Sequence, residues 1–112
     1  YARSTNKVGV CDATVGPGAT NLIAGIAESY TSGIPVVAIV SDVRADWRLR
    51  DSFQEIDQIN VFKPITKAVF SVDYIERIPE FIKRAFQIAT RTAEHSYDPD
   101  KTMALGRVDI AQ

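Results

Sequence analysis

The sequence predicts an α/β fold, a parallel sheet with helices on both faces. Two short apolar runs, residues 8–13 and 35–41, have the length and the β-branched content of buried strands. The segment between them carries apolar side chains at helical spacing: Leu22, Ile23, Ile26, Ala27 and Tyr30. A strand, a helix and a second strand joined by short connections form a βαβ unit, and the two strands of such a unit run parallel.

Composition limits the size and the class of the protein. A chain of 112 residues forms one domain at most, and an apolar share of 46% with a charged share of 24% is ordinary for a globular protein. The net charge of −1 gives no basis for a nucleic-acid or membrane-surface partner, and no apolar run reaches the length of a membrane span. The single cysteine, Cys11, cannot form an internal disulfide, which fits a reducing cytoplasm.

The turn after the first run is the main candidate site. Gly16-Pro17-Gly18 joins the predicted strand 8–13 to the predicted helix. The glycines permit a tight backbone and a close ligand approach, and proline suits the first turn of a helix. The motif is neither a P-loop nor a dinucleotide fingerprint. From these residues alone, a structural turn and a ligand-facing turn both remain open.

The flanking elements follow from local signals. Residues 1–6 predict the end of a helix, and the strand 8–13 is expected to be covered on both faces with Cys11 as a small core residue. The next helix should run over residues 17–32, with Gly33 as its C-terminal stop.

A charged loop should follow the second strand. Residues 42–51 surround Trp47 with aspartates and arginines. Two interpretations are open: a solvated loop with balanced charges, or a surface that packs on a partner subunit or lines a substrate entrance. Ser52 and Glu55 have the spacing of a capping box, so we expect Glu55 to accept the Ser52 N–H at the start of a short helix that ends at Asn60.

The last third of the chain predicts a third strand and a long helix. The strand covers residues 68–72, Asp73 should cap a single turn, and Pro79 should occupy the first position of the helix. One apolar stripe along it indicates core packing: Ile75, Ile78, Ile82, Ala85, Phe86 and Ala89. Residues 91–105 are polar, with His95 read as a loop residue rather than a metal ligand, and residues 107–110 predict a last strand.

Five blocks of sequence occur in one order: Tyr-Ala-Arg at 1–3, Gly-Val-Cys-Asp-Ala-Thr-Val-Gly-Pro-Gly-Ala-Thr-Asn at 9–21, Ile-Pro-Val-Val-Ala-Ile-Val-Ser at 34–41, Ser-Phe-Gln-Glu at 52–55 and Pro-Ile-Thr-Lys at 64–67. Together they resemble the N-terminal pyrimidine-binding domain of thiamine-diphosphate-dependent enzymes, in the acetolactate synthase-like branch. Residues 91–112 depart from the pattern of that family.

The resemblance implies a single partial domain over residues 1–112, truncated at the N-terminus just after the family's catalytic glutamate, with a C-terminal truncation left open. It implies thiamine diphosphate as the cofactor, with Mg²⁺ held by a domain not present here, and a 2-keto acid as substrate. The implied partners are a diphosphate-binding domain of the same or a partner chain and further copies in a homo-oligomer. The chain alone should be inactive, with no catalytic and no metal-binding residue of its own.

The resemblance also implies the roles of individual residues. Pro17, Asn21 and Gln54 would face the aminopyrimidine, Gly16 and Gly18 would give the backbone room, and Phe53 would form an apolar wall near the substrate. Structural alternatives stay open, with Asn21 bonding only the turn and Gln54 belonging only to its helix. Neither Glu28 nor Glu55 is placed to replace the missing glutamate. The alternative function is a noncatalytic α/β ligand-binding or interaction module.

Overall fold

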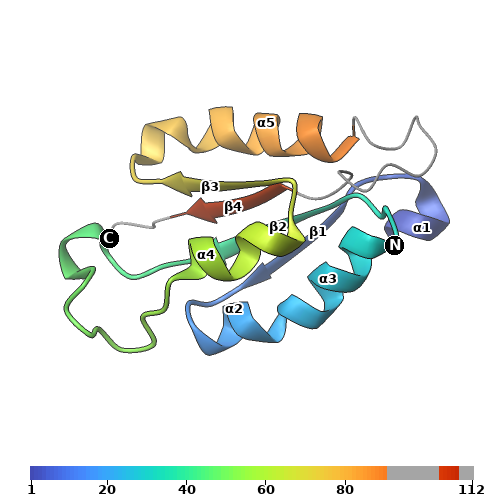
Figure 1. Cartoon of the computed structure of the whole chain (residues 1–112). Coiled ribbons are helices and arrows are strands. Elements are labelled where there is room, and N and C mark those ends of the chain that lie inside the picture. Colours follow the sequence, from blue (N-terminus) through green and yellow to red (C-terminus); the bar gives the residue numbers. More distant parts are fainter. Residues whose placement is uncertain (91–103, 109–112) are drawn as a thin grey trace.

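The computed structural model describes residues 1–90 and 104–108. Its sheet has the strand order β1-β2-β4-β3, and all neighbouring strands are parallel (Figure 1). The strands are β1 (Gly9–Ala13), β2 (Val36–Ser41), β3 (Ala68–Val72) and β4 (Ala104–Val108). The predicted parallel sheet is confirmed.

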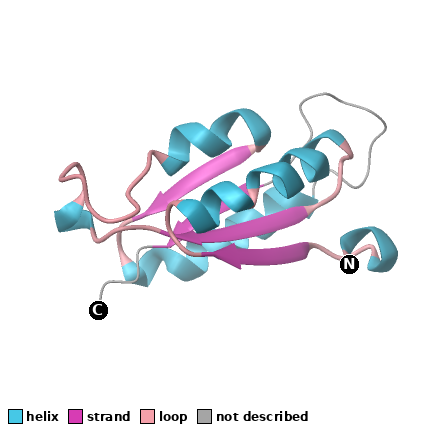
Figure 2. Ribbon diagram, turned by 90° about the horizontal axis from the view of Figure 1, so that it is seen from below, coloured by secondary structure: helices cyan, strands magenta, loops and turns pink. Residues whose placement is uncertain are grey.

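Helices cover both faces of this sheet, as predicted. The helix α5 (Ile78–Thr90) lies on one face. The opposite face carries α2 (Pro17–Asn21), α3 (Ile23–Thr31) and α4 (Gln58–Phe62) (Figures 1 and 2). The short α1 (Ala2–Thr5) precedes β1, and single 3-10 turns occupy Ala45–Trp47, Lys63–Ile65 and Ile75–Arg77.

Each face has its own apolar core, because successive side chains of a strand point to opposite sides of a sheet. On one face Val37 packs with Ala85 and Ala89 of α5. On the other face Ala38 and Val40 pack with residues of α2, α3 and α4, namely Ala19, Ile26 and Phe62. These two cores fix the sheet, and the loops at the carboxyl ends of its strands are built on that frame.

The strand β1 lies at one end of the described sheet. Val10 is 56% exposed, so the expectation that both faces of this strand are covered is wrong. The register pairs Val10 with Val37, which places it on the α5 face, but α5 packs on β4, β3 and β2. Cys11 points the other way and packs, half-buried, against the α3 core, which confirms it as a small core residue.

The ends of the early helices follow their local signals. Gly33 has φ +64°, and the N–H groups of Gly33 and Ile34 bond the carbonyls of Tyr30 and Ser29, so a Schellman motif ends α3 as the glycine predicts. The predicted helix 17–32 is broken at Leu22, whose N–H bonds the carbonyl of Ala19 three residues back.

Several predicted boundaries are wrong. The helix α4 begins at Gln58, not near Ser52, because Asp57 caps it, and it runs to Phe62 rather than Asn60. Asp73 does not cap the following turn, and Pro79 takes the second position of α5. Ile75 is 55% exposed and lies outside the core stripe. The last strand covers 104–108 rather than 107–110, and His95 lies outside the described residues.

Candidate functional site

Gly16 and Gln54 meet at the carboxyl end of the sheet. Gly16 follows β1, is buried and has φ +64° and ψ −111°. A Cβ added there would overlap the carbonyl oxygen of Gln54 and lie 2.9 Å from the Gln54 Cβ. Only a residue without a side chain permits this contact, so the glycine-proline turn and the segment after β2 converge on one place. In open α/β sheets ligands bind outside the carboxyl ends of the strands.

The two other residues of the turn have different surroundings. Pro17 is exposed at the first position of α2. A Cβ on Gly18 would lie 2.6 Å from the Cγ2 atom of Thr14. The room that the two glycines leave is therefore used by Gln54 and by Thr14, a residue that the sequence did not single out. Their use in the approach of a ligand stays a prediction.

Three further predicted residues lie around this turn. Asn21 is exposed at the end of α2, one turn beyond Pro17, and its side chain makes no hydrogen bond within residues 1–90 and 104–108. Gln54 has φ +62° and belongs to a turn rather than to a helix. Phe53 beside it is 85% exposed. The structure therefore shows neither of the two structural alternatives, in which Asn21 bonds the turn or Gln54 belongs to a helix.

The carboxylate of Glu55 closes the turn that carries Gln54. Its oxygens accept the N–H groups of Leu49 at 2.6 Å and of Ser52 at 3.0 Å. These bonds, the one from Leu49 first, lower the pKa of Glu55. The predicted contact with the Ser52 N–H is confirmed, although it forms in a turn. Glu28 accepts the Ser32 hydroxyl at the far end of α3.

A hollow of about 460 Å³ lies beside this turn. It is lined by Asp42, Arg48, Leu49, Asp51, Glu55, Ile56 and Asp57. Four carboxyl groups against one guanidinium make an unfavourable place for a diphosphate, because like charges repel. A phosphate-bearing cofactor that uses the turn would need cationic groups from elsewhere.

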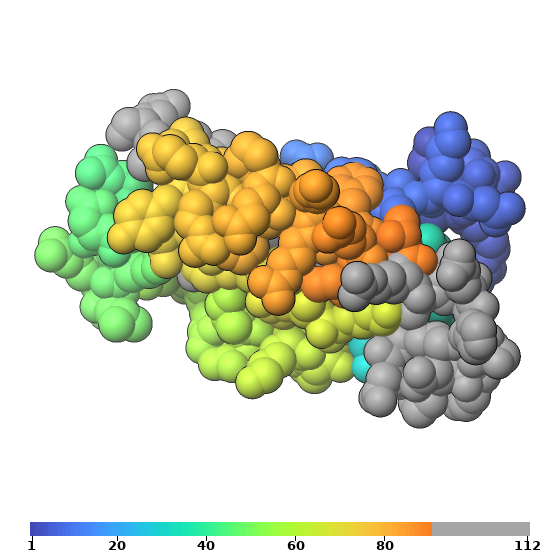
Figure 3. All heavy atoms as spheres, turned by 90° about the horizontal axis from the view of Figure 1, so that it is seen from above, coloured from blue at the N-terminus to red at the C-terminus, as the bar shows by residue number. Residues whose placement is uncertain are grey.

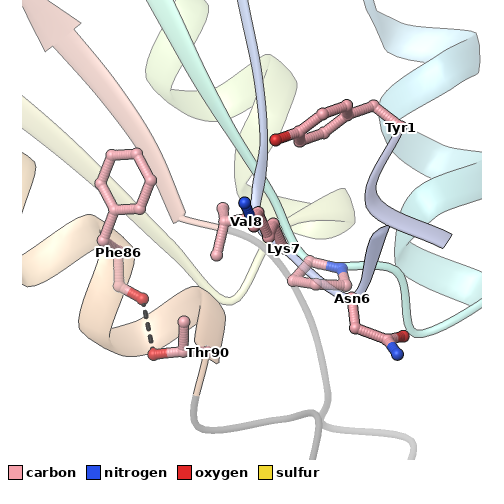
Figure 4. A pocket seen from close by; sticks show the side chains of 7 residues that line it. Tyr1, Asn6, Lys7, Val8, Phe86 and Thr90 are labelled. Carbon is pink, nitrogen blue, oxygen red and sulfur yellow. Dashed lines mark hydrogen bonds between the residues drawn. The ribbon is translucent and has the colours of Figure 1, made fainter. Parts of the chain in front are cut away.

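A second hollow, of about 390 Å³, opens at the amino ends of β1 and β2 (Figure 4). Tyr1 and Phe86 stand on opposite sides of it, and the Thr90 hydroxyl donates to the Phe86 carbonyl at 2.8 Å. Val8 lines it just before β1, so it lies at the other end of the strands from Gly16. It is separate from the candidate site.

Two polar residues near the site, the buried Gln58 and the half-buried Arg48, make contacts that have no signal in the sequence. Gln58 is 5% exposed and donates through Nε2 to the Ser41 carbonyl at 3.0 Å, which ties α4 to the end of β2. Arg48 joins carboxylates from two separate loops. Such contacts link positions far apart in the chain, which local spacing does not predict.

In the part of the chain that the structure describes, no group of three His, Cys, Asp or Glu side chains could hold a metal ion. Burial first, and the charge of Asp12 second, raise the pKa of the Cys11 thiol, which makes it a poor nucleophile. None of the helices in residues 1–90 is long and apolar enough to cross a membrane.

Comparisons with known proteins show the family of this chain. Residues 1–61 match the family model of the thiamine pyrophosphate enzyme, N-terminal TPP binding domain. The probable acetolactate synthase large subunit of Methanocaldococcus jannaschii is 43% identical over 112 residues, covering 98% of this chain and 19% of that protein. The acetolactate synthase isozyme 2 large subunit of Escherichia coli is 47% identical over 89 residues, covering 80% of this chain and 16% of that protein.

The chloroplastic acetolactate synthase of Arabidopsis thaliana is 44% identical over 90 residues, covering 80% of this chain and 13% of that protein. The chain thus spans less than a fifth of the length of these relatives. The family model covers the Gly16 turn and Gln54, the two segments that the fold brings together. The chain therefore belongs to the thiamine pyrophosphate enzymes, through their N-terminal TPP-binding domain.

Proposed function

We propose that this chain binds the aminopyrimidine ring of thiamine diphosphate as part of an acetolactate synthase-like enzyme that processes 2-keto acids. The observation that carries the proposal is the contact of Gly16 with the Gln54 backbone, within a domain of the thiamine pyrophosphate enzymes. That contact joins two segments that are 38 positions apart in the numbering (54 − 16) at the ligand-binding end of the sheet.

The chemistry of the side chains fits an aminopyrimidine. Such a ring has flat apolar faces, ring nitrogens that accept hydrogen bonds and an amino group that donates them. The amides of Asn21 and Gln54 both donate and accept, and Pro17 offers an apolar surface. When bound, thiamine diphosphate supplies carbanion chemistry. The residues of this chain would hold and orient its ring, and Phe53 would shield the substrate from water.

The rest of the site would come from other parts of the enzyme. The hollow beside Gln54 is acidic, so the diphosphate and its Mg²⁺ would be held by a diphosphate-binding domain of the same or a partner chain. Without that domain, this chain alone would not catalyse the reaction. We propose that the enzyme is cytoplasmic, because the single cysteine cannot form an internal disulfide. We also propose that it is a homo-oligomer, because β1 is an edge strand of the described sheet.

The test is a calorimetric titration of thiamine diphosphate with Mg²⁺ into a longer polypeptide that carries this segment. Gln54→Ala and Asn21→Ala should each weaken binding about tenfold, because a lost hydrogen bond of about 1.4 kcal/mol is one decade in affinity. Gln87→Ala is the matched control, since Gln87 is an exposed amide on α5. Equal affinity for all three variants would contradict the proposal. If the longer polypeptide binds the cofactor but shows no turnover of a 2-keto acid in an activity assay, the noncatalytic module is favoured.

A further inference from the structure

Arg48 lies in the segment 42–57, between β2 and α4, and contacts the ends of two strands. Its Nη2 atom lies 2.7 Å from Oδ1 of Asp73, and its Nε atom lies 3.9 Å from Oδ2 of Asp42. Asp42 directly follows β2, and Asp73 directly follows β3. The strand β4 runs between β2 and β3. One guanidinium therefore spans the carboxyl end of the central part of the sheet.

The pair of Arg48 with Asp42 differs from an ordinary surface pair in its burial, whereas the Asp73 side chain of the shorter pair is 47% exposed. The side chain of Asp42 is 4% exposed and that of Arg48 is 28% exposed. An exposed pair contributes little, whereas removing one partner of a buried pair leaves an uncompensated charge. In contrast, the pair of Arg44 with Asp46, in the same segment, is more than half exposed on both sides and reaches neither strand end.

The segment 42–57 has a strained backbone and several hydrogen bonds within itself. Leu49, Asp51 and Gln54 all have positive φ, which residues with side chains rarely adopt. Glu55 accepts the N–H groups of Leu49 and Ser52, and the Ser52 hydroxyl donates to the Trp47 carbonyl at 2.7 Å. These bonds hold the loop in one conformation, but each joins two residues of the loop itself. Arg48 connects the loop to the sheet, through its contacts with Asp42 and Asp73.

The position of the loop decides where Gln54 lies. Gln54 is six residues beyond Arg48 and packs its backbone on Gly16. Figure 3 shows the segment around residue 50 at the end of the molecule opposite the N-terminal helix, beside the start of α5. A loop displaced from the strand ends would carry Gln54 away from the glycine turn.

We propose that Arg48 is a positioning residue, which clamps the segment 42–57 to Asp42 and Asp73 and so holds Gln54 against Gly16 for ring binding. This rests on the proposed function for the ring, but the clamp itself is a property of the loop. Removing the guanidinium should release the loop and weaken cofactor binding without removing any group that touches the cofactor.

The first arm of the test measures the loop alone. Trp47 is the single tryptophan of the chain and adjoins Arg48, so its time-resolved fluorescence anisotropy in the 112-residue chain reports the motion of the loop. Arg48→Met should raise the amplitude of the fast depolarisation about twofold, and Arg48→Lys should restore part of it. Arg50→Met is the matched control, with the same charge change and an exposed side chain in the same loop.

The second arm measures the affinity for thiamine diphosphate with Mg²⁺ in the longer polypeptide. Arg48→Met should weaken it at least about tenfold, because displaced contacts in a positioned site are costly. Asp73→Asn weakens the 2.7 Å contact, because it removes the negative charge of the acceptor, and should act in the same direction. This second variant keeps the test valid if Arg48→Met does not fold.

The outcomes separate the two proposals. Unchanged anisotropy in Arg48→Met and Asp73→Asn overturns the clamp, whatever the cofactor does. A looser loop with unchanged affinity overturns the positioning role. If the unsubstituted polypeptide does not bind the cofactor, the proposed function fails and the positioning role with it, while the anisotropy still decides the clamp.

Discussion

Gly16 is the residue on which the candidate site depends most. Its backbone conformation, φ +64° with ψ −111°, disfavours a side chain, and its contact with the Gln54 carbonyl excludes one. The residue pattern alone left this turn open between a structural and a ligand-facing role. The family resemblance named Gly16 and Gln54 together, and the fold brings them into contact. Spacing along the chain could not do so, because the two residues belong to loops after different strands.

We expect Gly16→Ala to lower the free energy of unfolding by about 2 kcal/mol or more, because it strains the backbone and displaces Gln54. The measurement is urea denaturation. Gly25→Ala is the control, since a Cβ there meets nothing within 4 Å and alanine is the better helix former. Gly25→Ala should leave the free energy of unfolding unchanged or raise it. An equal loss of stability in both variants would contradict the close contact between Gly16 and Gln54.

The lowered pKa of Glu55 predicts how the loop responds to acid. A carboxylate whose folded pKa lies below the ordinary value stabilises the fold fully above that ordinary value, and this stabilisation is lost as the pH falls through the folded pKa. Urea midpoints between pH 7 and pH 3 should therefore fall less steeply for Glu55→Gln than for the unsubstituted chain. Glu76→Gln, on an exposed turn, is the control. Parallel curves for all three proteins would contradict this role.

At the scale of elements, periodic signals were reliable and capping signals were ambiguous. Apolar runs predicted β2 and β3 within a residue, and Gly33 marked the end of α3. The capping-box spacing of Ser52 and Glu55 predicted a helix start five residues too early for α4, whose cap is Asp57. The same side-chain bond to a backbone N–H closes a turn as well as a helix, so the spacing alone cannot separate the two.

The observed cap gives a prediction at this scale. Asp57 accepts the N–H of Asn60 at 3.1 Å, so Asp57→Ala should cost about 1 kcal/mol of stability, as cap removal does. Asp57→Asn should retain most of it, because asparagine caps helices equally well. Thermal denaturation measures both. A loss of the same size in the asparagine variant would show that charge, rather than capping, is what Asp57 contributes.

At the scale of the whole molecule, β1 is an edge strand of the sheet that residues 1–90 and 104–108 form. An unpaired strand edge with an exposed apolar side chain invites pairing with another chain. The sequence did not predict this exposure, because the apolar run at 8–13 indicated a strand covered on both faces, whereas α5 leaves Val10 uncovered.

Self-association of the chain is the expected consequence. Sedimentation velocity should show dimers or larger species, and Val10→Lys should shift them toward monomer, because a lysine on an edge strand disfavours pairing. Ile75→Lys is the control, since Ile75 is exposed to nearly the same extent but lies on a turn. A monomeric chain at high concentration would contradict the prediction.

The most direct measurement of the central claim is a crystal structure of the longer polypeptide with thiamine diphosphate bound. The aminopyrimidine ring should contact Pro17 and Gln54 at the carboxyl end of the sheet, with the diphosphate held outside this chain. A ring bound elsewhere, such as in the hollow between Tyr1 and Phe86 at the amino ends of the strands, would contradict it.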